Sequence, residues 1–240
     1  MTEPPPLGGT YRDAGVALAK GAVGAIPIAG GLIGELIGQI IPQQRFTRLE
    51  VYVRYLNERL EKLDKRESRE RLQDPENIDL FEEGAIQSAR ALSDERRAHI
   101  AKLVASGITG EKKSRIEAKR LLNLLNEIDD EQIIILASFI DRNKMGSEFW
   151  EKHRPIISPG QLTGGSTKEK VDQATINGLA RDNLIRLGLL QPKFTRQRPG
   201  ALTRLDASTG TLKPERYGLT SLGQLLLFRL GLAVEGDYFF

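Results

Sequence analysis

The stretch GAIPIAGGLIGELIGQII, residues 24–41, decides how the rest of the chain is interpreted. Its one charged residue is Glu35, and it is rich in glycine. Residues 21–41 have about the length that a helix needs to cross roughly 30 Å of hydrocarbon. Pro27 and the glycines after it allow a kink or a tight hairpin. The stretch therefore belongs either in a membrane or in a protein core.

Small residues recur at every fourth position of this stretch. Gly30, Gly34 and Gly38 form a G-x-x-x-G-x-x-x-G stripe, along which another helix backbone can approach closely. Glu35 and Gln39 form a polar stripe beside the glycines. Burying a lone carboxylate near the centre of a bilayer costs about 2.5 to 3.5 kcal/mol. Two arrangements therefore remain open. Several copies could pack through the glycines around a water-filled lumen, or an amphipathic hairpin could pack its Ile and Leu side chains on the rest of the protein.

The composition excludes several classes of function. The 240 residues include no cysteine and two histidines, which excludes disulfide frameworks, thiol nucleophiles and zinc sites built on Cys or several His. The net charge of +3 is unlike that of a strongly basic nucleic-acid coat. Residues 107–114, GITGEKKS, lack the spacing of a phosphate-binding loop. We expect no enzyme, no catalytic residues, no metal site and no cofactor.

The start of the chain, MTEPPP, has no basic region of the kind that opens a signal peptide. We therefore expect a cytoplasmic protein with a disordered tip over residues 1–13, followed by the hydrophobic glycine-zipper segment over residues 14–43. Association with the inner membrane would come from that segment.

Residues 44–153 are predicted to form a helical bundle. Its first helix has an apolar seam at alternating spacings of three and four. The seam consists of Phe46, Leu49, Val53, Leu56, Leu60 and Leu63. Further helices are predicted over residues 78–91, after a cap at Ser93, over residues 111–126 and from the acidic start DDEQ at residue 129.

A Pro, Gly and Ser/Thr cluster at residues 154–167 is interpreted as a linker, followed by a domain over residues 168–240. That domain is predicted to consist of a helix that ends at Gly188, a hairpin with a long loop, and a last helix capped by Thr220 or Ser221. This order is similar to a winged helix. The fold class expected for the whole chain is therefore mainly α, with a small winged-helix-like α+β module at its C-terminal end.

Basic residues gather on or near the predicted wing of this module. They are Lys193, Arg196, Arg198, Arg204, Lys213 and Arg216. Such a wing can lie along phosphates, and Phe194 places an aromatic ring among the charges. The helix before the wing has Asp182 beside Arg181 and few side chains suited to reading bases. The wing could therefore bind a protein regulator or DNA, and DNA is the less favoured of these two partners.

Taken in order, several segments resemble the Abi-alpha family of proteins associated with bacterial abortive infection. The matching segments follow the apolar start and its charged helix: LFEEGAIQSARALSDERRAHIAKLVASGI, LLNLLNEIDDEQIIILASF, NLIRLGLL and LTSLGQLLL. The resemblance implies a role in defence against phage and brings no catalytic residues with it.

Two functions follow from these patterns. The first is a non-enzymatic antiphage effector that assembles as a homo-oligomer in membrane lipid, with Gly30, Gly34 and Gly38 packing the copies and Glu35 and Gln39 facing a lumen. The alternative is a soluble winged-helix protein that binds DNA or a protein through its basic wing.

Overall fold

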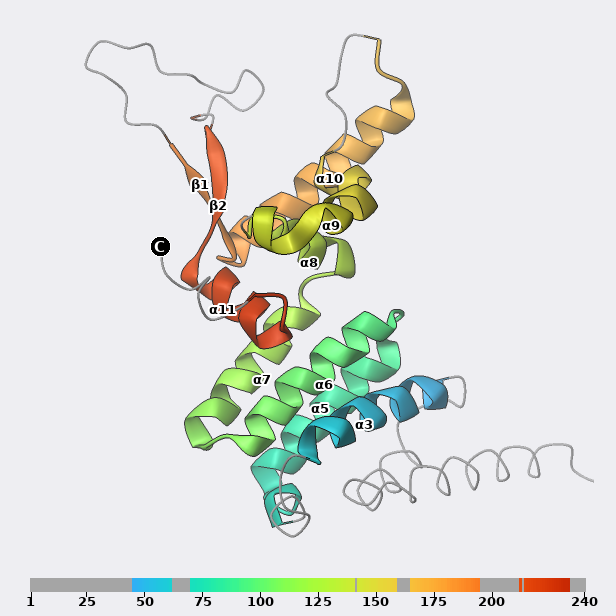
Figure 1. Ribbon diagram of the computed structural model, residues 1–240, viewed down its shortest axis with the longest axis vertical. Helices are drawn as coiled ribbons and strands as arrows, with labels where there is room; N and C mark the ends of the chain where they lie inside the picture. The colour runs from blue at the N-terminus through green and yellow to red at the C-terminus, as the bar shows by residue number, and fades with distance from the viewer. Residues whose placement is uncertain are drawn as a thin grey trace, which may run out of the picture. The chain divides into compact units, whose positions relative to one another are not determined.

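The computed structural model describes residues 45–61, 70–140, 142–158, 165–194, 212 and 214–233. These residues form mainly helices, together with a small two-stranded sheet (Figure 1). The mainly helical class predicted from the sequence is confirmed at this level. The predicted tip and the glycine-zipper segment, residues 1–13 and 14–43, lie outside the described residues. In chain order the elements are α3 (Phe46–Leu60), α5 (Pro75–Arg90), α6 (Asp94–Thr109), α7 (Lys112–Asn126), α8 (Asp130–Ala137), α9 (Arg142–Ile157), α10 (Lys168–Arg186), β1 (Leu190–Lys193), β2 (Arg216–Leu219) and α11 (Ser221–Leu230).

The chain divides into two compact units, one that ends at Asn126 and one that begins at Glu127. The division lies upstream of the linker predicted at residues 154–167. Helices α8 and α9 belong to the second unit because α8 contacts α9, α10 and α11. Contacts between elements far apart in the sequence therefore set the boundary.

The first unit is a helical bundle in which α6 contacts α3, α5 and α7. The predicted seam of α3 points into this bundle. Its members Leu49, Val53, Leu56 and Leu60 are at most 1% exposed. Tyr52 is also fully buried, and its hydroxyl donates a hydrogen bond to the carbonyl oxygen of Phe81 at 3.2 Å. The spacing of apolar residues thus predicted the buried face of α3 correctly.

Polar side chains fix where the helices of this unit begin. Asp74 caps α5 by accepting a hydrogen bond from the backbone N–H of Glu76 at 2.9 Å, and Pro75 occupies the first turn, where its missing N–H costs nothing. Ser93 caps α6 by accepting from the N–H of Arg96 at 3.1 Å, as the sequence predicted. These caps satisfy backbone donors that have no partner within the helix.

The second unit is built on α8, whose side chains Ile133, Ile135 and Leu136 are buried. Asp129 and Gln132 form a capping box at its start. Gln132 also donates a hydrogen bond to the carbonyl oxygen of Ala180 at 2.9 Å, which ties α8 to α10. One buried polar side chain thus both caps a helix and joins two elements.

Interactions between nearby residues also determine how the chain runs from α10 through the hairpin to α11. Gly188 follows α10 with φ of 70°, a left-handed conformation that glycine adopts without strain, and it ends the helix as predicted. Strands β1 and β2 then pair antiparallel, with Leu190 opposite Leu219 and Lys193 opposite Arg216. Thr220, one of the two predicted caps, begins α11 by accepting from the N–H of Gly223 at 3.0 Å.

None of the helices in the described part of the chain is both long enough and apolar enough to cross a bilayer. The segment predicted to do so, residues 14–43, lies outside that part.

Candidate functional site

The hairpin of the second unit places two cations on neighbouring strands at the end where the connecting loop leaves it. Lys193 ends β1, Arg216 begins β2, and the register sets them directly opposite each other. Both side chains are exposed. Like charges in this position repel each other, so an anionic group bound between them would stabilise the pair.

The Lys193 side chain crosses the hairpin over Gly218. A Cβ atom at Gly218 would lie 2.6 Å from Cε and 3.0 Å from Nζ of Lys193. The lysine stem therefore lies over the glycine backbone, which holds the ammonium group above β2. Phe194 follows directly and is 52% exposed. The loop end of the hairpin thus carries the aromatic ring of Phe194 and the exposed charged residues Lys193, Glu215 and Arg216.

An arginine of α10 packs against the hairpin. The guanidinium carbon of Arg181 lies 5.1 Å from the centre of the Tyr217 ring, a cation–π distance. The Nε atom of Arg181 is buried and has no hydrogen-bond acceptor among the described residues. Arg181 therefore helps to hold α10 against β2 and is not presented to a ligand.

Of the six basic residues predicted for the wing, the structure describes Lys193 and Arg216 and brings them together. The other four, Arg196, Arg198, Arg204 and Lys213, lie outside the described residues, as do Gly30, Gly34, Glu35, Gly38 and Gln39 of the predicted packing site.

Helix α10 has an exposed apolar face that the sequence reasoning missed. Leu179, Ile176 and Val171 are 65%, 56% and 42% exposed, whereas Asn177 and Leu184 are buried. The signal was present in the sequence, since Ile176 and Leu179 are three residues apart and lie close together on a helix. What the sequence could not supply was which face of α10 the rest of the unit covers.

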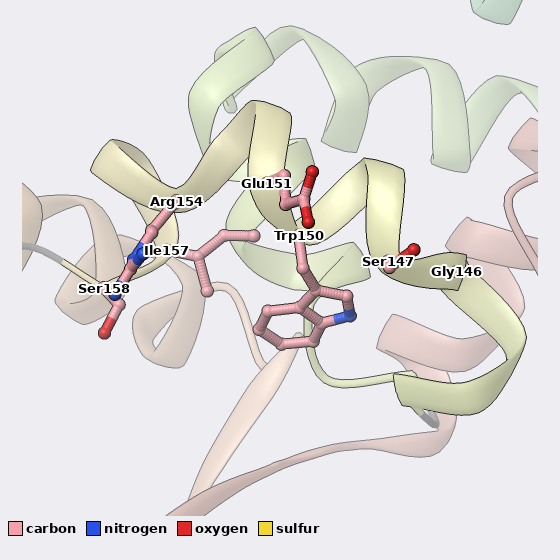
Figure 2. A pocket seen from close by; sticks show the side chains of 7 residues that line it. All are labelled: Gly146, Ser147, Trp150, Glu151, Arg154, Ile157 and Ser158. Carbon is pink, nitrogen blue, oxygen red and sulfur yellow. The ribbon is translucent and has the colours of Figure 1, made fainter.

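A second feature that the sequence reasoning missed is a pocket of about 750 Å³ along one face of α9 (Figure 2). Within α9, Gly146 interrupts the helical geometry with φ of 74° and ψ of 159°. The lining includes an indole, an aliphatic side chain and two opposite charges, a mixture that suits a small ligand with an apolar body. The described lining residues are Gly146, Ser147, Trp150, Glu151, Arg154, Ile157 and Ser158.

The aromatic rings of α9 also contact one another. The Phe149 ring meets the Trp150 ring edge-on at 6.3 Å between centroids, and it lies 4.9 Å from the His153 ring. Burial lowers the pKa of His153, and the nearby charge of Lys152 lowers it further. Both effects favour the neutral form of the imidazole. Across the described ranges, no group of three or more His, Asp or Glu side chains is arranged to hold a metal ion.

Comparison of the chain with known protein families, with curated proteins and with solved structures finds no match.

Proposed function

We propose that the protein is a non-enzymatic antiphage effector of the abortive-infection kind, which associates with the inner membrane through residues 14–43 while its two folded units form the body. The observation that carries this proposal is that α3, the first described helix after that segment, buries its apolar side chains against α5 and α6. Leu49, Val53 and Leu56 are buried, and α3 packs on α5 and α6.

The surface of the first unit supports the same proposal. Its exposed large hydrophobic side chains, among the described residues, are Leu92 and Ile116. They come from different places, the connection before α6 and the first half of α7. An Ile- and Leu-rich hairpin would need a continuous apolar surface to cover, and two separate side chains do not provide one. The described surface of the first unit therefore offers no continuous apolar cover for residues 14–43, which favours lipid or other copies of the segment over packing on that unit.

In this proposal the glycines and the polar residues of the segment have different tasks. Gly30, Gly34 and Gly38 pack copies closely, because nothing projects between the helix backbones. Glu35 and Gln39 then face a polar lumen, which avoids the cost of a lone carboxylate in lipid. The result would be a membrane-permeabilising assembly, with the bundle and the C-terminal unit as its sensor or regulatory body.

The test begins with the full-length chain expressed in bacteria and washed with alkaline carbonate. We expect the protein to stay in the membrane pellet and to be toxic on phage infection. Gly34→Ile should remove toxicity because it blocks close packing, whereas Ala29→Ile adds the same side chain on the Ile and Leu face, away from the glycines and from Glu35, and should leave toxicity in place. Equal toxicity of both variants, or a native chain that stays soluble before and during infection, would contradict the proposal.

The exposed pair Lys193 and Arg216 favours a second candidate function. In it, α10, the hairpin and α11 act as a winged-helix-like module that binds DNA or a protein partner through the basic wing. The described residues favour a protein over DNA, because α10 exposes Asp172, Ile176 and Leu179 and only a few side chains suited to base edges, among them Gln173 and Arg186.

Binding of a mixed-sequence DNA duplex at increasing salt separates these partners. If the wing lies on DNA, Lys193→Ala and Arg216→Ala should weaken binding and reduce the salt slope by about one phosphate contact each. Lys119→Ala removes a cation from the first unit and is the matched control. Absence of salt-dependent binding by the native chain would exclude DNA and leave the protein partner.

A further inference from the structure

Helix α10 carries two lines of residues on opposite faces. Asn177 and Leu184 are seven residues apart, and both are buried. Asp172, Leu179 and Arg186 are also seven residues apart and lie about 200° around the helix from the first line, since each residue turns the helix by about 100°. All three are exposed. The core of the second unit therefore uses one face of α10 and leaves the opposite face available.

The exposed line is symmetric about its centre. Leu179 is 65% exposed, with Asp172 one way along the helix and Arg186 the same distance the other way. At about 1.5 Å of rise per residue, each charge lies roughly 10 Å from Leu179. An acid and a base placed symmetrically about an apolar side chain form a surface that is complementary to itself when one copy is turned end over end.

Arg186 keeps part of its guanidinium available for such a contact. Its Nε and Nη2 atoms donate to the Oδ1 atom of Asn183 at 3.2 and 2.8 Å, and Nη2 lies 3.5 Å from a carboxylate oxygen of Glu127. Among the described residues these contacts use Nε and Nη2, which leaves Nη1 for a further carboxylate. The Arg186 side chain is 64% exposed.

We propose that α10 binds α10 of a second copy of the chain in antiparallel orientation, with Leu179 against Leu179 of the partner subunit and Asp172 of each copy paired with Arg186 of the other. A parallel pair would set Asp172 against Asp172 and Arg186 against Arg186, so like charges exclude it. Ile176 extends the apolar contact beside Leu179, with 56% of its side chain exposed. This pairing goes beyond the proposed membrane function and does not depend on residues 14–43.

The face suits a second copy better than a nucleic acid. The exposed acids of α10, Glu169, Asp172 and Asp182, balance its exposed bases, Lys168, Lys170 and Arg186, so the exposed side chains of the helix have no net positive charge to attract phosphates. The symmetric placement of charge about Leu179 is a property that only a two-fold pair uses in full. A single helix pair buries less than a standard interface of about 1,600 Å², so the dimer is expected to depend on protein concentration.

Exchange of the two charges provides the decisive test, with dimerisation measured by sedimentation of the full chain. The measurements are made in the native and the Gly34→Ile backgrounds, so that glycine-zipper assembly is separated from the α10 contact. Asp172→Arg and Arg186→Asp should each weaken the dimer about tenfold or more, because opposite charges become like charges. The double variant restores both pairs with their signs exchanged and should dimerise like the native chain.

Mixing the two single variants adds an internal control. One copy then carries two bases and the other two acids, so mixed dimers should form although neither variant dimerises alone. A substitution that merely damaged the fold would be rescued neither by the double variant nor by mixing. Failure of both rescues, or dimers that withstand both single substitutions, would overturn the proposal.

Cross-linking tests the orientation, because the native chain has no cysteine. Leu179→Cys places one thiol at the two-fold axis, where the Cα atoms come within the roughly 7 Å that a disulfide spans. Arg186→Cys places the two thiols about 20 Å apart in the antiparallel pair. We expect covalent dimers from Leu179→Cys and none from Arg186→Cys. Equal cross-linking of the two variants would show a parallel pair and overturn the proposal.

Discussion

In the part of each unit that the structure describes, the exposed large hydrophobic side chains are Leu92 and Ile116 in the first unit and six in the second, namely Val171, Ile176, Leu179, Phe194, Leu212 and Leu222. The first unit encloses its apolar residues among α3, α5, α6 and α7. The second unit covers α8, whereas Ile176 and Leu179 of α10 and Phe194 after β1 are exposed. The difference indicates that the first unit is a self-sufficient body and that the second presents surfaces for contacts.

A large truncation in the first core gives the strongest test of this difference. Phe81 is fully buried, and its ring lies 5.8 Å from the ring of Tyr52. Phe81→Ala removes that packing and should lower the free energy of unfolding of the first unit by about 3 to 5 kcal/mol. Hydrogen exchange of the α6 amides measures the loss, while the α11 amides should keep their protection.

The matched control for Phe81→Ala is Leu92→Ala, since Leu92 is 83% exposed. It should change the stability by no more than about 0.5 kcal/mol. If Phe81→Ala lowered the protection of α11 as much as that of α6, the two units would unfold together and the comparison between them would fail.

Two helical glycines provide the next largest contrast. A Cβ atom at Gly84 would lie 2.6 Å from both the Tyr52 hydroxyl oxygen and the Cγ2 atom of Val104. Gly84→Ala should therefore destabilise the first unit by about 1 to 3 kcal/mol through overpacking. A Cβ atom at Gly178 in α10 would meet nothing within 4 Å, so Gly178→Ala should stabilise the second unit by about 0.5 to 1 kcal/mol.

If the two units differ as described, Gly84→Ala lowers the free energy of unfolding and Gly178→Ala raises it. Amide exchange in α6 reports Gly84→Ala, and fluorescence of Trp150, the single tryptophan, reports Gly178→Ala in a urea titration. A loss of stability from Gly178→Ala would mean that something covers α10 at that point and would contradict an open face.

The sequence predicted the parts of the fold that depend on local chemistry. The seam of α3, the cap at Ser93 and the end of α10 at Gly188 follow from spacing, from a hydroxyl that accepts a backbone hydrogen bond and from a left-handed residue. Each of these depends on residues within a few positions along the chain. They could therefore be predicted without knowing which elements meet.

The sequence did not predict features that depend on distant contacts. The division of the compact units after residue 126 is one such feature, because it follows from the packing of α8 against α10 and α11, while the linker at residues 154–167 stays a prediction from composition. The open face of α10 was missed for the same reason, since its helical pattern does not say which side is covered. Of the candidate site, the gathering of Lys193 and Arg216 was predicted, and the strand register that makes them neighbours was not.

The junction between the hairpin and α11 gives a smaller effect. Thr220 accepts from the N–H of Gly223 at 3.0 Å and donates its hydroxyl hydrogen to the carbonyl oxygen of Gly188 at 2.6 Å. Thr220→Ala loses both bonds and should cost about 1 kcal/mol, measured by Trp150 fluorescence in urea. Thr167 precedes α10 without a capping bond, so Thr167→Ala should cost less than about 0.5 kcal/mol. Equal costs would contradict a capping role for Thr220.

The smallest expected effect is a loss of stability of the first unit, and not of the second, at acidic pH. A hydrogen bond from Arg115, together with the backbone N–H of Glu76, lowers the pKa of Asp74 below its usual value. Because the pKa is lower in the folded state than in the unfolded state, the carboxylate stabilises the unit at neutral pH. That contribution is lost as the pH falls below about 4 and through the folded-state pKa.

Asp74→Asn should therefore flatten this part of the acid profile, followed through the amide signals of α5 in urea titrations. Arg115→Gln should move the same transition to higher pH, because it removes the main cause of the lowered pKa. If neither variant altered the profile, the Asp74–Arg115 contact between α5 and α7 would not stabilise the first unit, and packing alone would account for its closed core.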